Sequence, residues 1–490
     1  MGVLWGLLVV CALLPCASAD VKLLRPSPLV SGCRVVVDAG SSATRFFVFI
    51  SRDGSDDVEM VDTFPHLTPG LSHTPPHNAY GYMKDALHEV QTHVQARDQH
   101  TTCHVHIYGT AGMRLLQPAH QMDIYDAIFT SFHADASMTL VLDRKHLQTI
   151  SDDDEGYFFV LAANFLDKRV GKDLVPSFVE LYGVLDLDGA SAQVVFDAEN
   201  RWRHNSRRKS FATSPLTTRD FYIHRFAGYG TDEMEVKVLA QLQTINATEN
   251  VCNFVGHTDS HGRMGTGDAV GCMTLLRQLV NESNVRCPLQ MYCALDSQAQ
   301  PHLAGGSFYA THVFYAATAF AKDVLTTLPP DDQHWTPFDF PTPLRHEVEQ
   351  AAVAVCHQSF ASLQTLSLTH TPADTLPRRC LDLAYVSVLL AQFGFLDDEK
   401  RVVYVDAIQH RRFMDWPLGA FLATEVEGHV EYENAMAEYL SARVDQGLPV
   451  GYHLALLVLA FAALALWQTV HRASGRDGTH AMEFVHDASK

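Results

Sequence analysis

Short apolar runs along the chain predict β-strands, and two longer segments predict helices. The runs are rich in β-branched and aromatic residues and are bounded by turn residues, as is typical of strands. They span residues 34–38, 46–51, 103–108, 182–187 and 193–196. Residues 78–94 instead have apolar residues at helical spacing, and residues 156–166 are expected to form a helix opened by acidic residues. Alternating strands and helices predict the α/β class.

Two of the predicted strand pairs carry the same polar pattern in their turns. Residue Asp38 ends one strand and is followed by a turn rich in Gly and Ser, and Asp186 ends another strand before a similar turn. One helix headed by Glu155 separates the two pairs. This duplication predicts two related α/β lobes that face each other across a cleft. The segment 197–300, which is richer in charge and cysteine, is expected to be surface elaboration of the second lobe.

The first residues have the pattern of a signal peptide. An apolar stretch, 3–14, precedes the small residues Ala17 and Ala19, which predicts cleavage after residue 19. No Lys or Arg precedes the apolar stretch, so an uncleaved anchor stays open as the alternative. Both readings predict export from the cytosol.

A second apolar segment lies near the other end, at 448–470. Tyr452 and Trp467 would lie at the two interfaces of a bilayer, and Arg472 follows on the cytoplasmic side. We expect a single transmembrane helix, with a buried C-terminal helix as the alternative. A GPI signal is less favoured because a polar tail follows. The expected order is a signal peptide, an N-terminal lobe, a C-terminal lobe with disulfide-bearing insertions, a returning helix, a membrane helix and a cytoplasmic tail, at 1–19, 20–166, 167–425, 426–447, 448–470 and 471–490.

Charge and cysteine content narrow the class of protein. A net charge of −20 argues against a nucleic-acid partner, because such partners need cations to neutralise phosphates. The same charge means that a polyphosphate substrate would need a metal cation or aimed backbone N–H groups. Eight cysteines follow the predicted signal peptide, and an even count in an exported chain predicts disulfides.

The two turns suggest phosphate chemistry. A turn such as Gly40 to Thr44 can direct backbone N–H groups at a phosphate, and an Asp before it can hold water on a divalent metal. Phosphoryl transfer to water also needs a carboxylate that deprotonates the water. Glu155 is the candidate base, but its acidic neighbours 152–154 leave the assignment open, and an acidic helix start is also what the helix dipole favours.

At these positions the chain resembles the apyrase family of nucleoside triphosphate diphosphohydrolases. Four segments match its first four conserved regions in order: V-V-D-A-G-S-S-A-T-R at 36–45, Y-G-T-A-G-M-R-L-L at 108–116, I-S-D-D-D-E-G at 150–156 with A-N-F-L at 163–166, and L-D-L-D-G-A-S-A-Q at 185–193. T-P-G-L-S at 68–72 also matches, and the segments 308–316, 380–385 and 416–420 resemble later regions more loosely.

The resemblance implies an actin-like, ribonuclease H-type fold of two lobes, with an interdomain active-site cleft. It also implies hydrolysis of nucleoside tri- or diphosphates with Ca²⁺ or Mg²⁺. Glu155 would be the general base, and Asp38, Asp186 and Gln193 would hold metal-bound waters. Trp416 would pack under the metal or be plain core, and Arg45 and Arg114 would lie near the cleft or form structural ion pairs. The expected nucleotide and phosphate contacts are Ser41, Ser42, Ala43, Thr44, Arg45, Thr110, Arg114, Asp188, Gly189, Ala190, Ser191, Gln193 and Tyr309.

The chain also departs from the family pattern. Asp188 and Asp152 stand where the family has glycines, Val160 where it has tryptophan, and Ala43 where it has His or Gly. A carboxylate at Asp188 is expected to disfavour phosphate unless a cation takes its charge. A weak or inactive lumenal nucleotide-binding relative therefore stays open as the alternative function. A sugar-kinase or heat-shock-type ATPase of the same fold is less favoured, because such proteins are mostly cytosolic.

The resemblance also bears on disulfides and location. In an actin-like lobe the strands that begin at Cys33 and Cys103 would be parallel neighbours, so a Cys33–Cys103 disulfide is expected, with two separate buried thiols as the alternative. A local Cys356–Cys380 pair is also expected, and the other four cysteines stay unassigned. The catalytic part is expected in the secretory lumen or outside the cell, on a membrane, or secreted if 448–470 does not span. Nucleobase, oligomeric state and protein partners are not specified.

Overall fold

The computed structural model describes residues 32–427, apart from short gaps, and residue 459. The gaps are 53–54, 56, 98–101, 178, 199–214, 282–290, 304–305, 329–337, 409–410 and 413–414. The chain divides into two compact units, Met1–Val426 and Glu427–Lys490. The fold and the site below belong to the first unit.

The first sheet has five strands in the order β3-β2-β1-β4-β5. An antiparallel meander of three strands is extended by two strands that run parallel to the first. The strands are β1 (Cys33–Ala39), β2 (Thr44–Ser51), β3 (Val58–Val61), β4 (Cys103–Gly109) and β5 (Leu147–Thr149).

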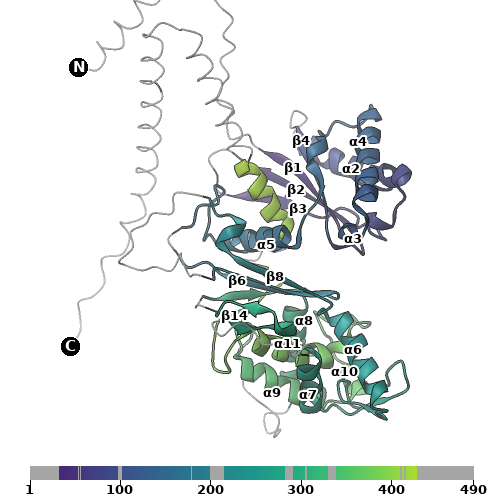
Figure 1. Ribbon diagram of the computed structural model, residues 1–490, viewed down its shortest axis with the longest axis vertical. Helices are drawn as coiled ribbons and strands as arrows, with labels where there is room; N and C mark the ends of the chain where they lie inside the picture. Colours follow the sequence, from purple (N-terminus) through teal and green to yellow (C-terminus); the bar gives the residue numbers. More distant parts are fainter. Residues whose placement is uncertain are drawn as a thin grey trace, which may run out of the picture. The chain divides into compact units, whose positions relative to one another are not determined.

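Alternation along β1 sends its side chains to two different cores. Val35 and Val37 pack with residues of the helices α2 (Ala79–Arg97) and α4 (Pro118–Ala134), which lie together on one side of the sheet (Figure 1). Val36 belongs to a separate cluster on the opposite face. The short helix α3 (Ala111–Arg114) follows the end of β4 directly.

The second sheet repeats this plan in the order β14-β13-β6-β7-β8. A three-stranded antiparallel meander is again extended by two parallel strands. Its strands are β6 (Gly183–Leu187), β7 (Ser191–Phe196), β8 (Tyr222–Ala227), β13 (Phe308–Ala310) and β14 (Val402–Tyr404). The duplicated lobe expected from the two hairpins is therefore present, and the α/β fold class is confirmed.

Helices of the second lobe surround a buried central helix. Every residue of α11 from Arg379 to Leu390 is buried, and α11 contacts α6, α7, α8 and α9. The helices are α6 (Thr231–Thr244), α7 (Ala269–Leu279), α8 (Val313–Leu325), α9 (Arg345–Cys356), α10 (Phe360–Leu363) and α11 (Arg379–Phe393). The remaining strands are two-residue pairs: β9 (Glu249–Asn250) with β10 (Met264–Gly265), β11 (Tyr292–Cys293) with β12 (Ala299–Gln300), and β15 (Ala407–Ile408) with β16 (Arg411–Arg412).

The expectation that 197–300 is surface elaboration is wrong for its helices. Met234 of α6 and Leu276 of α7 are fully buried in the main cluster of the second lobe. Each of these helices has one apolar face and one polar face, and the charged residues give the whole segment the composition of a surface region.

Two helical segments join the cores of the two sheets. Helix α5 (Asp152–Leu166) contacts β6, β7 and β8 of the second sheet, yet its residues share one cluster with Val36 and Phe49 of the first. Residues 416–426 are helical and lie beside α5 (Figure 1). A Cβ at Gly419 would meet the carbonyl oxygen of Phe158 at 1.7 Å, so only glycine permits this close approach.

Three disulfides join described cysteines. The expected Cys33–Cys103 and Cys356–Cys380 bonds are present, with Cα separations of 4.5 and 5.1 Å. Cys33 and Cys103 are register partners at the starts of the parallel strands β1 and β4. Cys252 pairs with Cys272, and Cys293 is disulfide-bonded as well.

The predicted signal peptide, returning helix, membrane helix and tail fall outside the described residues, except for residues 426, 427 and 459. Within the part that the structure describes, no helix combines the length and apolarity needed to cross a bilayer.

Acid should destabilise the first lobe through His106. Its side chain is 1% exposed, and burial, with the positive charges of His146 and Arg34, lowers its pKa to about 2. An Arg34 N–H group also lies 3.1 Å from His106 Nε2, where only a neutral ring can accept a hydrogen bond. Because this pKa is depressed below the ordinary 6.5, stability is full above pH 6.5 and falls as the pH drops.

We expect His106→Gln to reduce the loss of unfolding free energy between pH 6.5 and 5 by about 2 kcal/mol. Urea denaturation at both pH values measures the difference, with the exposed His302→Gln as the control. An equal pH dependence in the wild type and H106Q would contradict this assignment.

Candidate active site

The two Asp-bearing hairpins hold their polar groups at equivalent register positions. Asp38 of β1 is the cross-strand partner of Arg45 of β2, and Asp186 of β6 is the cross-strand partner of Gln193 of β7. Each pair flanks a turn that contains Gly and Ser. The repeated fold therefore presents two similar polar turns.

Asp38 is buried in an ion-pair cluster with two other residues. Arg45 donates through Nε and a terminal nitrogen to Asp38 Oδ2, at 3.0 and 2.6 Å, and donates to Asp415 at 2.8 Å. Burial raises the pKa of Asp38 to about 6, with Asp415 and Glu155 adding to the effect and Arg45 opposing it. Thr110 Oγ1 lies 3.5 Å from the other oxygen, Oδ1, so these two predicted site residues are neighbours.

The cap of α5 is made by Asp154 and not by Glu155. Ser151 Oγ accepts from the N–H of Asp154 at 3.0 Å, and Asp154 Oδ2 accepts from the N–H of Ser151 at 3.1 Å. This reciprocal capping box satisfies the helix start. Glu155 is therefore not needed as a cap, which removes the main structural alternative for it.

The Glu155 carboxylate is instead held by two arginines. Arg114 and Arg225 each donate to Glu155 Oε2 at 2.9 Å. Asp152, three residues before Glu155 in the same helix, lies 2.7 Å from Arg114 and 3.2 Å from Arg225. Both contacts use the same oxygen of Glu155, so Oε1 is left for another partner.

Arg225 was missed by the sequence analysis. It lies on β8, and its Nε donates to Ser191 Oγ at 2.9 Å, so it links the second turn to the candidate base. Its distance in sequence from Glu155 is 70 residues, and only the pairing of β7 with β8 brings it near.

We expect Arg225→Leu to lower kcat by about 10- to 100-fold with a smaller change in KM, because Glu155 would lose one of its two fixed donors. Arg225→Lys should recover part of the loss, since a cation remains. Steady-state kinetics measure both, with Arg219→Leu, an exposed change just before β8, as the matched control. A KM effect alone would contradict a positioning role.

Asp186 lies in a second cluster, with His312 and Asp188. His312 Nδ1 is 2.5 Å from Asp186 Oδ1 and 3.6 Å from Asp188 Oδ1, and Thr311 Oγ1 donates to Asp186 Oδ1 at 2.9 Å. The Asp186 carboxylate raises the pKa of His312 to about 10 against partial desolvation. Desolvation by the surrounding walls and the like charge of Asp186 raise the pKa of Asp188 to about 7, although its side chain is 49% exposed.

The pKa of Asp186 is set by its neighbours. Burial acts to raise its pKa, but the His312 charge and the hydrogen bonds from His312 and Thr311 outweigh burial, so the pKa is lowered. A carboxylate and an imidazole are both suitable ligands for a divalent cation. These side chains could hold a metal at this turn, and their mutual ion pair and hydrogen bonds also hold them together without one.

Other predicted site residues divide into two groups. Ser41, Ser42 and Ala190 are exposed on the turns, and Gln193 Nε2 donates to the carbonyl of Asp152 at 3.3 Å. The backbone of residue 230 packs closely against the second turn, because a Cβ at Gly230 would meet the carbonyl oxygen of Gly189 at 2.2 Å.

Two predicted contacts and Trp416 are buried. Thr44 accepts from the N–H of Leu71 at 3.2 Å through its hydroxyl. Tyr309 lies on β13 and packs against Tyr182. Trp416 packs against Tyr108 and Phe158, and both roles predicted for it, packing under the metal and plain core, would bury it.

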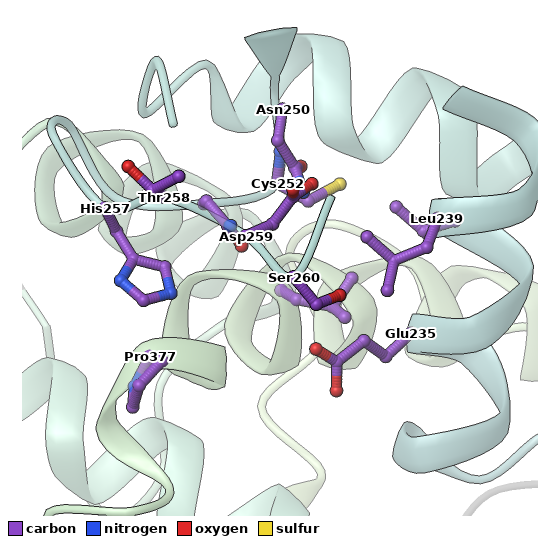
Figure 2. Close-up of a pocket in the computed structure, with 12 residues that line it drawn as sticks. Glu235, Leu239, Asn250, Cys252, His257, Thr258, Asp259, Ser260 and Pro377 are labelled. Atoms are coloured by element: carbon purple, nitrogen blue, oxygen red, sulfur yellow. The ribbon is translucent and has the colours of Figure 1, made fainter. Parts of the chain in front are cut away.

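The cavity in Figure 2 lies elsewhere in the second lobe. It has a volume of about 110 Å³ and is lined by residues of α6 and of the segment 250–260, among them Glu235 and Asp259. None of its lining residues belongs to the two turns or to α5.

Comparison with known proteins decides the family. The GDA1/CD39 (nucleoside phosphatase) family matches residues 32–431. The chain belongs to this family. It is therefore a hydrolase of phosphoanhydride bonds whose substrates are nucleotides.

Individual relatives agree over most of the chain. Probable apyrase 3 of Arabidopsis thaliana is 26% identical over 440 residues, covering 83% of this chain and 85% of that protein. Ectonucleoside triphosphate diphosphohydrolase 2 of Mus musculus is 25% identical over 463 residues, covering 85% of each. A crystal structure of nucleoside triphosphate hydrolases from Neospora caninum superposes with a TM-score of 0.58 at 15% identity, covering 81% of this chain and 93% of that one. This last likeness concerns the fold, which this GDA1/CD39 family member shares.

Proposed function

We propose that the chain hydrolyses nucleoside tri- or diphosphates by direct attack of water on the terminal phosphorus, with a divalent cation and without a phosphoenzyme. The observation that carries the proposal is the position of Glu155. Its carboxylate is fixed by Arg114 and Arg225, while the helix cap is made by Asp154. Arg225 also donates to Ser191 of the second phosphate turn, so this carboxylate is fixed next to the predicted phosphate contacts.

In the proposed step, Glu155 accepts a proton as the water oxygen bonds to the terminal phosphorus. The bridging P–O bond breaks, orthophosphate leaves, and the remaining nucleotide keeps the bridging oxygen with its electron pair. Ser41, Ser42 and the turn at 188–191 would bind the phosphate oxygens through backbone N–H groups and hydroxyls. Asp38, Asp186 and Gln193 would hold the water shell of Ca²⁺ or Mg²⁺, which neutralises the phosphate charge when bound.

The proposal includes the location of the reaction. Three disulfides among the described cysteines fit an oxidising compartment. We propose that the enzyme acts in the secretory lumen or outside the cell and is held there by the apolar segment 448–470, or is secreted if that segment does not span.

Phosphate release from ATP, ADP, GDP and UDP tests the activity directly. We expect release with Ca²⁺ or Mg²⁺ and none in excess EDTA, and no radioactive protein after acid quenching of a reaction with [γ-³²P]ATP. Full activity in EDTA, or a trapped phosphoenzyme, would contradict the proposed mechanism. Nucleotide binding without turnover would instead support a non-catalytic relative.

A further inference from the structure

Three metal-binding side chains converge beside the second turn. Asp186 comes from β6, Asp188 from the turn after it, and His312 from the start of α8. One ligand atom from each lies within 4.8 Å of the other two. The resemblance described above has glycine at the position of Asp188, so this carboxylate is a feature of this chain.

The distances suit direct coordination. Two ligands held about 2.0–2.1 Å from one tetrahedral metal lie about 3.4 Å apart. His312 Nδ1 and Asp188 Oδ1 are 3.6 Å apart, close to this spacing. His312 Nδ1 and Asp186 Oδ1 are nearer, at 2.5 Å. A metal would replace the hydrogen between them and increase their separation by about 1 Å.

Neighbouring groups orient these ligands. Thr311 Oγ1 donates to Asp186 Oδ1 at 2.9 Å and can fix the direction of that carboxylate, as hydrogen-bond donors to metal-binding carboxylates do. His312 has φ 51 and ψ −118, a conformation that a non-glycine residue seldom adopts, at the N-cap of α8. Its ring lies nearly parallel to that of Phe159. The imidazole lies against both carboxylates, 2.5 Å from Asp186 Oδ1 and 3.6 Å from Asp188 Oδ1.

We propose that Asp186, Asp188 and His312 bind a divalent transition-metal ion such as Co²⁺ or Zn²⁺ directly, before nucleotide arrives. Ca²⁺ and Mg²⁺ prefer oxygen ligands, whereas an imidazole nitrogen suits the later first-row ions. The inference rests on the proposed function in placing a cation at the second phosphate turn, and it changes how Asp186 acts there, as a direct ligand and not through a bound water. It also changes the expected effect of Asp188, whose charge would be shared with a cation instead of repelling the substrate.

The experiment uses the full chain without a histidine tag, stripped of metal and free of nucleotide. Co²⁺ titration followed by visible absorption reports on coordination, and Ca²⁺ competition reports on selectivity. We expect one Co²⁺ site that Asp188→Asn and His312→Gln each weaken at least tenfold. Ca²⁺ should compete only at a concentration at least tenfold higher. His302→Gln, an exposed change, is the matched control and should leave the titration unchanged.

Two results would overturn the site. Unchanged Co²⁺ affinity in Asp188→Asn would mean that Asp188 and His312 form only an ion pair. Asparagine has the same shape as aspartate, so this variant still tests the site if His312→Gln does not fold. Uptake of Co²⁺ by the wild type only with nucleotide would mean that the three side chains are not sufficient ligands.

Hydrolysis measured on the same preparation separates the two proposals. Nucleotide hydrolysis with Mg²⁺ but no nucleotide-free Co²⁺ site would remove this inference and leave the proposed function. A Co²⁺ site lost in the variants, without hydrolysis, would keep the site and remove the function.

Discussion

Replacing Glu155 with glutamine is expected to lower kcat by on the order of 10²-fold or more, while nucleotide affinity stays nearly unchanged. Glutamine keeps the shape of the side chain and can still accept from Arg114 and Arg225, but it cannot take a proton from water. The capping box at Ser151 and Asp154 is untouched, so the helix should form as before. Steady-state phosphate release and equilibrium binding of a nucleotide measure the two quantities.

Asp153→Asn is the matched control, since it makes the same chemical change on the same helical turn at an exposed position. It should leave kcat within a few-fold of the wild type. A near-normal kcat in E155Q would contradict the assignment of Glu155: either one of the acidic residues 152–154 is the base, or the role carried over from the family is wrong. A large loss in D153N would point to Asp153.

Removing the Cys33–Cys103 disulfide should cost about 4 kcal/mol of unfolding free energy, by the chain-entropy estimate for a 70-residue loop. The bond joins the starts of β1 and β4, the two parallel strands whose other ends carry Asp38 and Thr110. Its loss should therefore loosen the first phosphate turn as well as lower stability. Urea denaturation of Cys33→Ala/Cys103→Ala without reductant measures the effect.

The double variant at Cys252 and Cys272 provides the comparison. That bond closes a loop of only 20 residues in the second lobe, for which the same estimate is about 3 kcal/mol. We expect the first double variant to lose more stability and more activity than the second. A loss below 1 kcal/mol at Cys33 and Cys103 would contradict the constraint assigned to this bond.

The sequence predicted those parts of the fold whose contacting residues are close together along the chain. The hairpins at Asp38 and Asp186 were recognisable because strand, Asp and glycine turn are adjacent in sequence. The Cys33–Cys103 bond followed once the two strands were placed as parallel neighbours, whereas Cys252–Cys272 joins segments whose register no local pattern sets.

The residues missed at the site are those that only the tertiary fold brings near. His312 is 126 residues from Asp186 and meets it because β13 pairs with β6. Asp415 is 370 residues from its partner Arg45. The sequence alone could not distinguish a catalytic role of Glu155 from helix capping, because acidic residues at a helix start can serve either purpose. The hydrogen bonds of Asp154 in the structure assign the cap to that residue.

Hydrolysis of ATP in ¹⁸O-labelled water tests the central claim most directly, because it locates the bond that water forms. Direct attack on the terminal phosphorus predicts one ¹⁸O atom in the released orthophosphate and none in ADP, with both products absent when EDTA removes the divalent cation. Label in the nucleotide product, or undiminished hydrolysis in EDTA, would contradict a metal-dependent attack of Glu155-activated water at the terminal phosphate.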